Sequence, residues 1–180
     1  MAQKTVQQFV DEFVAKYGRT KRFRTDAHVM AVQNALRKGD KVHYAFVGKI
    51  YIGGGKDTAV FAITDTDIVI GMKSWKGASS QSIKIHTIQN VAESQSLMYG
   101  EISVQTLRGT YHIAGLDKNA VPELKEQLLK AMDRVQSAKD DASGGVDTIR
   151  LMKKLINIEL RGQLKDKVIT KEQFEKEIEK

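Results

Sequence analysis

The chain has 180 residues, of which 41% are hydrophobic and 28% charged, as in a soluble globular protein with one substantial core and small appendages. It has no cysteine, which excludes disulfides and thiolate chemistry, and no apolar run approaches the length of a membrane span. The formal net charge is +7, and residues 1–41 carry 9 Lys and Arg against 4 Asp and Glu, a net +5. We therefore expect a cytoplasmic protein with a basic N-terminal region.

Two amphipathic helices are expected near the N-terminus, over residues 5–17 and 26–37, with Thr25 capping the second. The first helix does not have the pattern of a signal peptide, because Asp11 and Glu12 interrupt its apolar residues. These apolar residues recur at helical spacing: Val6, Phe9, Val10, Phe13 and Val14.

The connector between these helices places four cations around one aromatic residue: Arg19, Lys21, Arg22 and Arg24 around Phe23. Such a patch could contact nucleic-acid phosphates with Phe23 stacking on a base, or an acidic protein surface, or anionic lipid. The same composition also fits a solvated turn, and no helix-turn-helix or zinc-finger pattern accompanies it. Nucleic-acid binding is therefore kept as an alternative function.

A run of about seven short strands is expected next. The first, residues 42–51, alternates two sets of side chains, with Val42, Tyr44 and Phe46 on one face and His43, Ala45 and Val47 on the other. A glycine-rich hairpin loop at 53–57 ends it. The other expected strands are 58–64, 67–73, 82–88, 90–94, 101–107 and 109–114, the last two joined at Arg108-Gly109.

After Gly115 the apolar period changes from two to 3.6, which predicts a long helix. Asp117 or Asn119 is the expected N-cap, and Pro122 fits because it lies in the first turn. Because an amphipathic helix is not stable alone, we expect its apolar stripe to plug the open end of the sheet. That stripe consists of Ala120, Leu124, Leu128, Ala131 and Val135.

Residues 36–132 resemble a bacterial pleckstrin-homology-like (PH-like) domain of the YokE type. The matching pieces are Leu36-Arg-Lys-Gly-Asp40 before the first strand, Thr64-Asp-Thr-Asp-Ile-Val-Ile70 at a turn, and Ile83-Lys-Ile85 followed by Ile88-Gln-Asn-Val91. The resemblance implies an α+β fold: a partly open barrel of about seven antiparallel strands capped by a helix. It also implies binding of proteins, peptides or lipids, and bacterial or bacteriophage origin.

The tail predicts a small helical hairpin, since Asp166-Lys167 interrupts one apolar stripe and Thr170 with Gln173 forms a capping box for the next helix. Leu160-Arg-Gly-Gln-Leu164 and Val168-Ile-Thr-Lys-Glu-Gln-Phe174 are similar to the short C-terminal domain called SHOCT, although Lys167 stands where that family has glycine. The expected organisation is a basic helical region at 1–38, a PH-like domain at 39–138, a linker at 139–147 and the SHOCT-like hairpin at 148–180.

The SHOCT resemblance implies interaction or oligomerisation. About thirty residues cannot bury a sufficient core alone, so the apolar residues of the tail need another surface. A second subunit is the favoured surface, which predicts a homo-oligomer, and packing within the chain is the alternative. The residues expected to carry this contact are Leu155, Ile156, Leu160, Ile169 and Phe174.

Trp75 lies between Lys73 and Lys76, at the hairpin tip that is expected over residues 74–77. An exposed tryptophan flanked by lysines suits an acidic partner, whereas an indole folded over the sheet edge would be structural. Only Lys49 and Lys56 lie on the first two strands and their loop, which argues against specific phosphoinositide binding. The glycine run at 53–55 lacks the spacing of a phosphate-binding loop.

No catalytic residue, metal site or cofactor is predicted. The four histidines, His28, His43, His86 and His112, are scattered without ligand spacing or a nearby acidic cluster. Asp65 and Asp67 flank a turn, where aspartate is expected for backbone capping. The sequence therefore predicts a non-enzymatic binding or assembly protein, with nucleic-acid binding as the alternative.

Overall fold

A computed structural model of the protein describes residues 4–17, 26–52, 55–74 and 77–140. The chain divides into two compact units, Met1–Gln136 and Ser137–Lys180. The strands and the two N-terminal helices of the described part all belong to the first unit.

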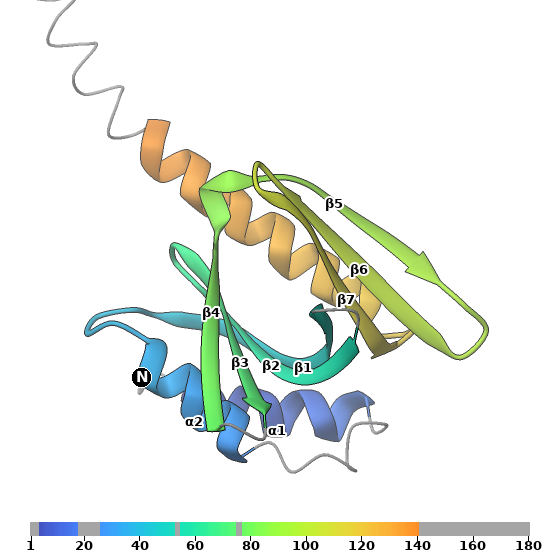
Figure 1. The fold of residues 1–180 in the computed structure, drawn as a ribbon. Coiled ribbons are helices and arrows are strands. Elements are labelled where there is room, and N and C mark those ends of the chain that lie inside the picture. Colours follow the sequence, from blue (N-terminus) through green and yellow to red (C-terminus); the bar gives the residue numbers. More distant parts are fainter. Residues whose placement is uncertain (1–3, 18–25, 53–54, 75–76, 141–180) are drawn as a thin grey trace, which may run out of the picture. The chain divides into compact units, whose positions relative to one another are not determined.

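Seven antiparallel strands form a single sheet in the order β4-β3-β2-β1-β7-β6-β5 (Figure 1). The chain thus makes two meanders, which join where Lys49 and Ile50 of β1 pair with Ala114 and Ile113 of β7. Within the described residues β4 and β5 are not paired, so the curled sheet is not closed, as the sequence predicts. The strands are β1 Val42–Ile52, β2 Gly55–Thr64, β3 Asp67–Ser74, β4 Gly77–Lys84, β5 Ile88–Gln95, β6 Tyr99–Thr106 and β7 Gly109–Asp117.

The expected helices are present, with α1 at Val6–Tyr17, α2 at Asp26–Ala35 and a long helix at residues 121–140. Helix α1 begins with a reciprocal capping box, in which Gln8 N donates to Thr5 Oγ1 at 3.2 Å and Thr5 N donates to Gln8 Oε1 at 2.8 Å. Asp117 organises the turn before helix 121–140, since its Oδ1 accepts from Asn119 N at 2.9 Å.

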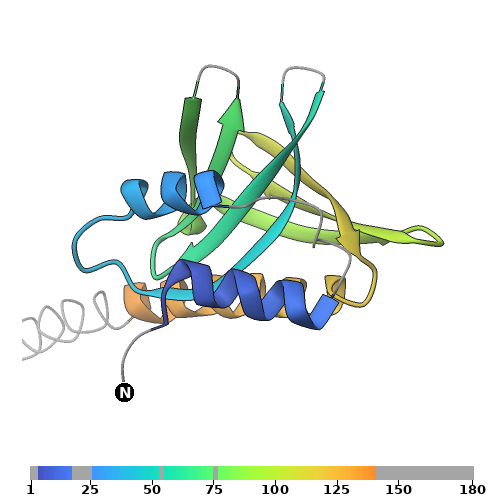
Figure 2. The ribbon, with the colours of Figure 1, turned by 90° about the horizontal axis from the view of Figure 1, so that it is seen from below.

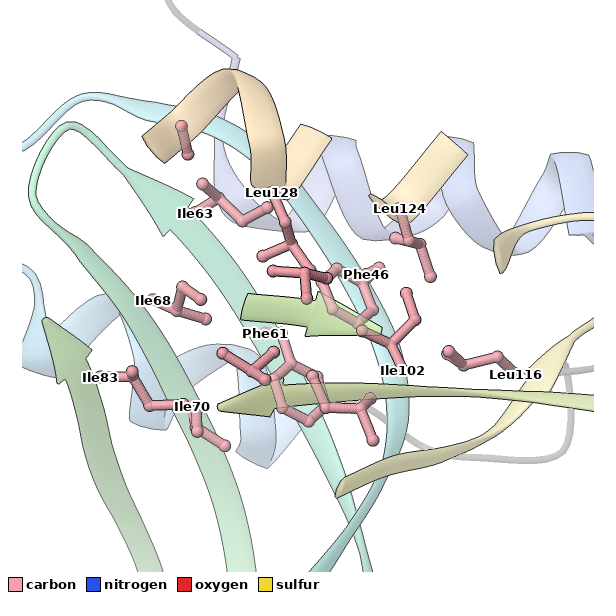
Figure 3. Packing of buried hydrophobic residues seen from close by; sticks show 14 of the residues in the cluster. Phe46, Phe61, Ile63, Ile68, Ile70, Ile83, Ile102, Leu116, Leu124 and Leu128 are labelled. Carbon is pink, nitrogen blue, oxygen red and sulfur yellow. The ribbon is translucent and has the colours of Figure 1, made fainter. Parts of the chain in front are cut away.

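The main core, called here the inner cluster, fills the interior of the curled sheet (Figure 3). Phe46 and Phe61 stack at its centre with ring centroids 4.8 Å apart. Leu124 and Leu128 of helix 121–140 complete it and are fully buried, which confirms that this helix plugs the open end of the sheet. Around them lie isoleucines of both meanders: Ile63, Ile68, Ile70, Ile83, Ile102 and Ile113.

A second hydrophobic cluster, the outer cluster, lies on the opposite face of β1, β2 and β3, where α1 and α2 pack (Figure 2). Helix α2 approaches β3 so closely that a Cβ at Gly71 would meet the backbone oxygen of His28. The first meander is therefore buried on both faces. The outer cluster consists of Val6, Val10, Val29, Val32, Val42, Ala45, Val47, Val60, Ala62 and Val69.

One expectation for β1 is wrong. Tyr44 and Phe46 face the inner cluster as predicted, but Val42 belongs to the outer cluster with Ala45 and Val47. The pairing of β1 with β2 shifts register between Val42 and Tyr44, and such an irregularity reverses the alternation of side chains. The periodicity of the sequence does not reveal this register shift, because an apolar residue such as Val42 can be buried on either face of the strand.

Strand boundaries also differ from the prediction. Strand β7 continues to Asp117, three residues beyond its expected end. Strand β2 begins three residues earlier than expected, at Gly55. The strand expected at 82–88 is replaced by β4, which runs from Gly77 to Lys84, and by a 3₁₀ turn at Ile85–Thr87. The first half of β4 is polar and exposed, so no alternation of apolar residues indicates where the strand begins. Ile85 in the 3₁₀ turn is buried like Ile83, so the apolar alternation continues past the end of the strand.

Candidate binding surfaces

Most of the residues that the sequence nominates for binding lie outside the described residues. They include Trp75 and Lys76, the basic connector with Arg19, Lys21, Arg22, Phe23 and Arg24, and the tail residues Leu155, Ile156, Leu160, Ile169 and Phe174. Of the nominated set the structure places Lys73, which is exposed near the end of β3. These assignments remain predictions.

The β5–β6 hairpin presents a candidate that the sequence analysis missed. It extends away from the rest of the sheet (Figures 1 and 2), and its tip carries three consecutive large apolar side chains. Leu97 is 89% exposed, Met98 52% and Tyr99 50%. The residues before them, Ser94 to Ser96, are uncharged.

The tip has a defined turn. Ser96 N donates to the backbone oxygen of Tyr99 at 2.7 Å, and Tyr99 N donates to Ser96 Oγ at 3.2 Å. Leu97 and Met98 are thus the two residues at the apex of a hydrogen-bonded turn. The sequence contains a signal for this surface. Three large apolar residues, 97–99, directly follow a serine-containing segment at the expected end of the strand at 90–94.

The residues that carry the PH-like resemblance meet around a buried carboxylate. Arg37 Nη2 lies 2.5 Å from Asp67 Oδ2, and Lys84 Nζ donates to the same oxygen at 3.0 Å. Thr66 Oγ1 donates to it as well, at 3.0 Å. A buried carboxylate with these partners stabilises the junction of α2, β3 and β4, so the motif has a structural role.

A second polar cluster joins α1 to helix 121–140. Glu123 accepts hydrogen bonds from Lys16 Nζ at 2.5 Å, from Tyr44 Oη at 2.8 Å and from Tyr17 Oη. Burial alone would raise the pKa of Glu123, but the hydrogen bonds from Lys16, Tyr17 and Tyr44 outweigh it and lower the pKa. Burial, followed by the hydrogen bond to Glu123, raises the pKa of Tyr44. Charged Glu123 thus stabilises this contact.

The two lysines of the first hairpin have different neighbours. Lys56 Nζ lies 4.6 Å from the centroid of the Tyr51 ring, and the aliphatic part of Lys49 packs beside Gly115. Their placement gives no support to a phosphoinositide site, which needs several converging cations.

The described histidines lie apart from one another. His43 Nε2 is 2.5 Å from Asp65 Oδ1, whereas His112 Nδ1 is 2.9 Å from Glu101 Oε1 and 3.1 Å from Ser103 Oγ. His28 is buried in α2, and His86 lies in the 3₁₀ turn. In the described ranges no group of three or more His, Cys, Asp or Glu side chains could hold a metal ion. Nor is any described helix long and apolar enough to cross a membrane.

Comparison with protein families decides the classification. The family model described as "Bacterial PH domain" matches residues 36–129, which is more than half of the chain. The chain belongs to the bacterial PH domain family. The seven-stranded open sheet with its closing helix is the fold of this domain, and no curated protein matches the chain.

Solved structures give more distant likenesses to this bacterial PH domain protein. The C-terminal domain of an unknown protein from Leishmania infantum is 20% identical with a TM-score of 0.40, over 51% of this chain and 86% of that one. An activated truncation of Vav1 is 11% identical with a TM-score of 0.44, over 71% of this chain and 35% of that one. The linker-DH/PH domains of p115-RhoGEF are 6% identical with a TM-score of 0.41, over 72% and 38%. The chain thus spans little more than a third of the latter two structures.

Helices α1 and α2 precede the part of the chain that matches the bacterial PH domain model. They are nevertheless packed onto the domain, through the outer cluster and through the hydrogen bonds of Lys16 and Tyr17 to Glu123. They cover one face of the first meander and leave the β5–β6 tip exposed. The tip is thus the clearest apolar surface that the described part offers to a partner.

Proposed function

We propose that the protein is a non-enzymatic adaptor that binds another protein, with the bacterial PH domain as its scaffold and Leu97 and Met98 as apolar anchors. The supporting observation is the exposed run Leu97-Met98-Tyr99 at the apex of a protruding, hydrogen-bonded hairpin. Runs of consecutive exposed apolar residues reduce solubility and are uncommon unless they serve binding.

The chemistry of the tip suits a protein pocket. Leu97 and Met98 supply flexible apolar volume, and Tyr99 adds an aromatic ring with a polar end, a residue type enriched at interfaces. The uncharged residues Ser94 to Ser96 allow the tip to be buried without desolvating a carboxylate. Since the turn is already formed, binding would cost little ordering entropy.

The test replaces the apex by serine in the double variant L97S/M98S. Leu107 provides the control, because it is 71% exposed at the β6–β7 turn, at the other end of β6. Tagged full-length protein is incubated with bacterial lysate, and the captured proteins are quantified. For at least one captured protein, we expect the amount bound by L97S/M98S to fall at least about tenfold, which corresponds to about 1.4 kcal/mol of binding free energy. L107S should retain this protein. Equal capture by both variants would contradict a role for the tip.

Self-association through the tail is the second part of the proposed function. Its support is the apolar stripe of Leu155, Ile156, Leu160, Ile169 and Phe174 within a segment of about 33 residues, too short for a core of its own. Deletion of residues 146–180 is expected to lower the mass measured by light scattering, relative to the mass calculated for one copy. An unchanged number of copies per particle would count against this part.

Lys73, Trp75 and Lys76 are proposed as a further contact for an acidic partner. Aromatic residues anchor protein interfaces, and the two lysines favour a carboxylate-rich surface. Replacing Trp75 by alanine should weaken capture more than replacing either lysine. The bacterial or phage-infected cell is the proposed setting, with the protein in the cytoplasm.

Nucleic-acid binding through the basic connector is the alternative. Four cations around Phe23 could bind phosphates and stack on a base. If this function holds, replacing Arg19, Lys21, Arg22 and Arg24 by alanine should abolish a salt-dependent association with single-stranded nucleic acid. Absence of any association of the unmodified protein at low salt would eliminate the alternative.

A further inference from the structure

The two edge strands of the sheet differ in how they are protected against pairing with another chain. Strand β5 has a register irregularity between Ile88 and Asn90, and its Glu93 lies 3.4 Å from Lys125 of helix 121–140. Bulges and charges are common devices that prevent an edge strand from pairing with another chain. At β5 the edge is therefore protected.

Strand β4 has neither device. Its pairing with β3 runs without a register shift from Lys84 opposite Asp67 to Gly77 opposite Ser74. Its one charged residue, Lys84, lies at its end and is bound to Asp67. Within the described residues β4 ends the strand order, and Ser79, Ser80 and Ser82 are exposed. An uninterrupted, uncharged edge of this kind is a template for a further strand.

We propose that β4 pairs in antiparallel orientation with β4 of a second copy of the chain. This pairing rests on the proposed function, which includes self-association, and adds to it a surface on the domain itself. A two-fold axis perpendicular to the sheet places the two sheets edge to edge, with corresponding faces on the same side. Side chains on one face of β4 therefore lie opposite side chains on the same face of the other copy's β4. The axis then passes through Ser80 or through Gln81.

Both registers are compatible with the side chains of β4. With the axis at Ser80, this serine faces its own copy and Ala78 faces Ser82; with the axis at Gln81, Ser80 faces Ser82 and Lys84 faces Ala78. In neither register do two charged residues of the strand lie opposite each other. Apart from Lys84 at its end, the strand has no charged side chain that would select an acidic or basic peptide.

Helix α2 packs against β3 and β4 on one face of the sheet. The two-fold axis puts both copies of α2 on this same face.

The test introduces like charges on the exposed face of β4 in the full-length chain. In the variant S80D/S82D, Asp faces Asp in either register, and the same holds for Lys in S80K/S82K. We expect each variant to have a lower mass by light scattering than the unmodified protein at equal concentration. An equimolar mixture of the two variants should regain the mass, because Asp then faces Lys.

The control variant N90D/A92D adds two carboxylates, with the same spacing as positions 80 and 82, at exposed positions of the other edge strand, β5, and is expected to keep the mass of the unmodified protein. Circular dichroism checks that every variant is folded. Unchanged mass in both β4 variants, or an unmodified chain that is monomeric throughout, overturns the β4 pairing. If deletion of 146–180 still lowers the mass when the β4 variants do not, the proposed function stands and only this pairing fails.

Discussion

In the described part of the chain, Glu123 of helix 121–140 accepts hydrogen bonds from Lys16 and Tyr17 of helix α1 and from Tyr44 of β1. Its folded pKa is lowered, with burial opposing the shift and hydrogen bonds from Lys16, Tyr17 and Tyr44 producing it. A carboxylate with a lowered folded pKa stabilises the fold above its unfolded pKa, and this contribution is lost as the pH falls through the folded pKa. The contact should therefore weaken in acid.

The variant E123Q is expected to lower the free energy of unfolding by about 1–3 kcal/mol at neutral pH, since hydrogen bonds to charged groups contribute that much. Urea unfolding at neutral pH and at about pH 3 measures the difference between variant and unmodified protein. The difference should shrink in acid, because Glu123 becomes protonated as the pH falls through its lowered folded pKa. A difference that is the same at both pH values would contradict the assignment.

Gly100 is where β6 meets the start of helix 121–140. A Cβ at this position would overlap Cγ2 of Val121, a buried residue of the first helical turn. The variant G100A is expected to destabilise the protein by about 1–3 kcal/mol, because overpacking forces side chains and backbone to shift. Thermal unfolding measures it.

The double variant G100A/V121A distinguishes overlap from a general requirement for glycine. Shortening Val121 makes room for the new methyl group, so the double variant should be more stable than the sum of the two single changes predicts. At Gly71 the overlap is with the backbone oxygen of His28, which a side-chain change cannot relieve. Strict additivity at the Gly100–Val121 pair would refute this explanation.

Helix α1 is the element whose role changed most between sequence and structure. Its amphipathic pattern predicts a helix but not the surface that it covers. In the structure Val6 and Val10 pack in the outer cluster, and Phe13 reaches the inner cluster with its ring centroid 6.0 Å from that of Phe46. The N-terminal helix therefore connects both cores of the domain.

The variant V10A is expected to lower the free energy of unfolding of the whole domain by about 1–3 kcal/mol, since Val10 is almost fully buried. Val14 on the same helix is only partly buried, so V14A is the matched control and should cost less. Guanidinium unfolding followed by circular dichroism of the strands gives the comparison. No effect of V10A on the free energy of unfolding would mean that α1 is not part of the cooperative unit.

Elements with strong periodicity were predicted well, and their failures have local causes. Leu124 and Leu128 marked the closing helix because their spacing allowed one buried stripe. Val42 was assigned to the wrong face because a register shift cannot be detected where apolar residues lie on both faces of a strand. The start of β4 was missed because none of the residues from Gly77 to Gln81 is fully buried. The tip at Leu97 was missed because residues 95–100 were expected only to connect the strands at 90–94 and 101–107.

At the scale of the whole molecule, the proposed function combines the scaffold of the bacterial PH domain with exposed surfaces that would bind partners. The bacterial PH domain at 36–129 is covered on one face by α1 and α2 and closed by helix 121–140. In the described part Leu97 and Leu107 are the two most exposed large apolar residues, and they lie at hairpin turns at opposite ends of β6. The adaptor proposal requires that the first of them contacts a partner.

Site-specific crosslinking at residue 97 tests this requirement most directly. The chain has no cysteine, so L97C and L107C each provide one attachment point for a photoreactive benzophenone maleimide. After irradiation in bacterial lysate, we expect a discrete protein adduct from position 97 that is absent from position 107. No adduct at position 97, or the same adducts at both positions, would contradict partner binding through the β5–β6 tip.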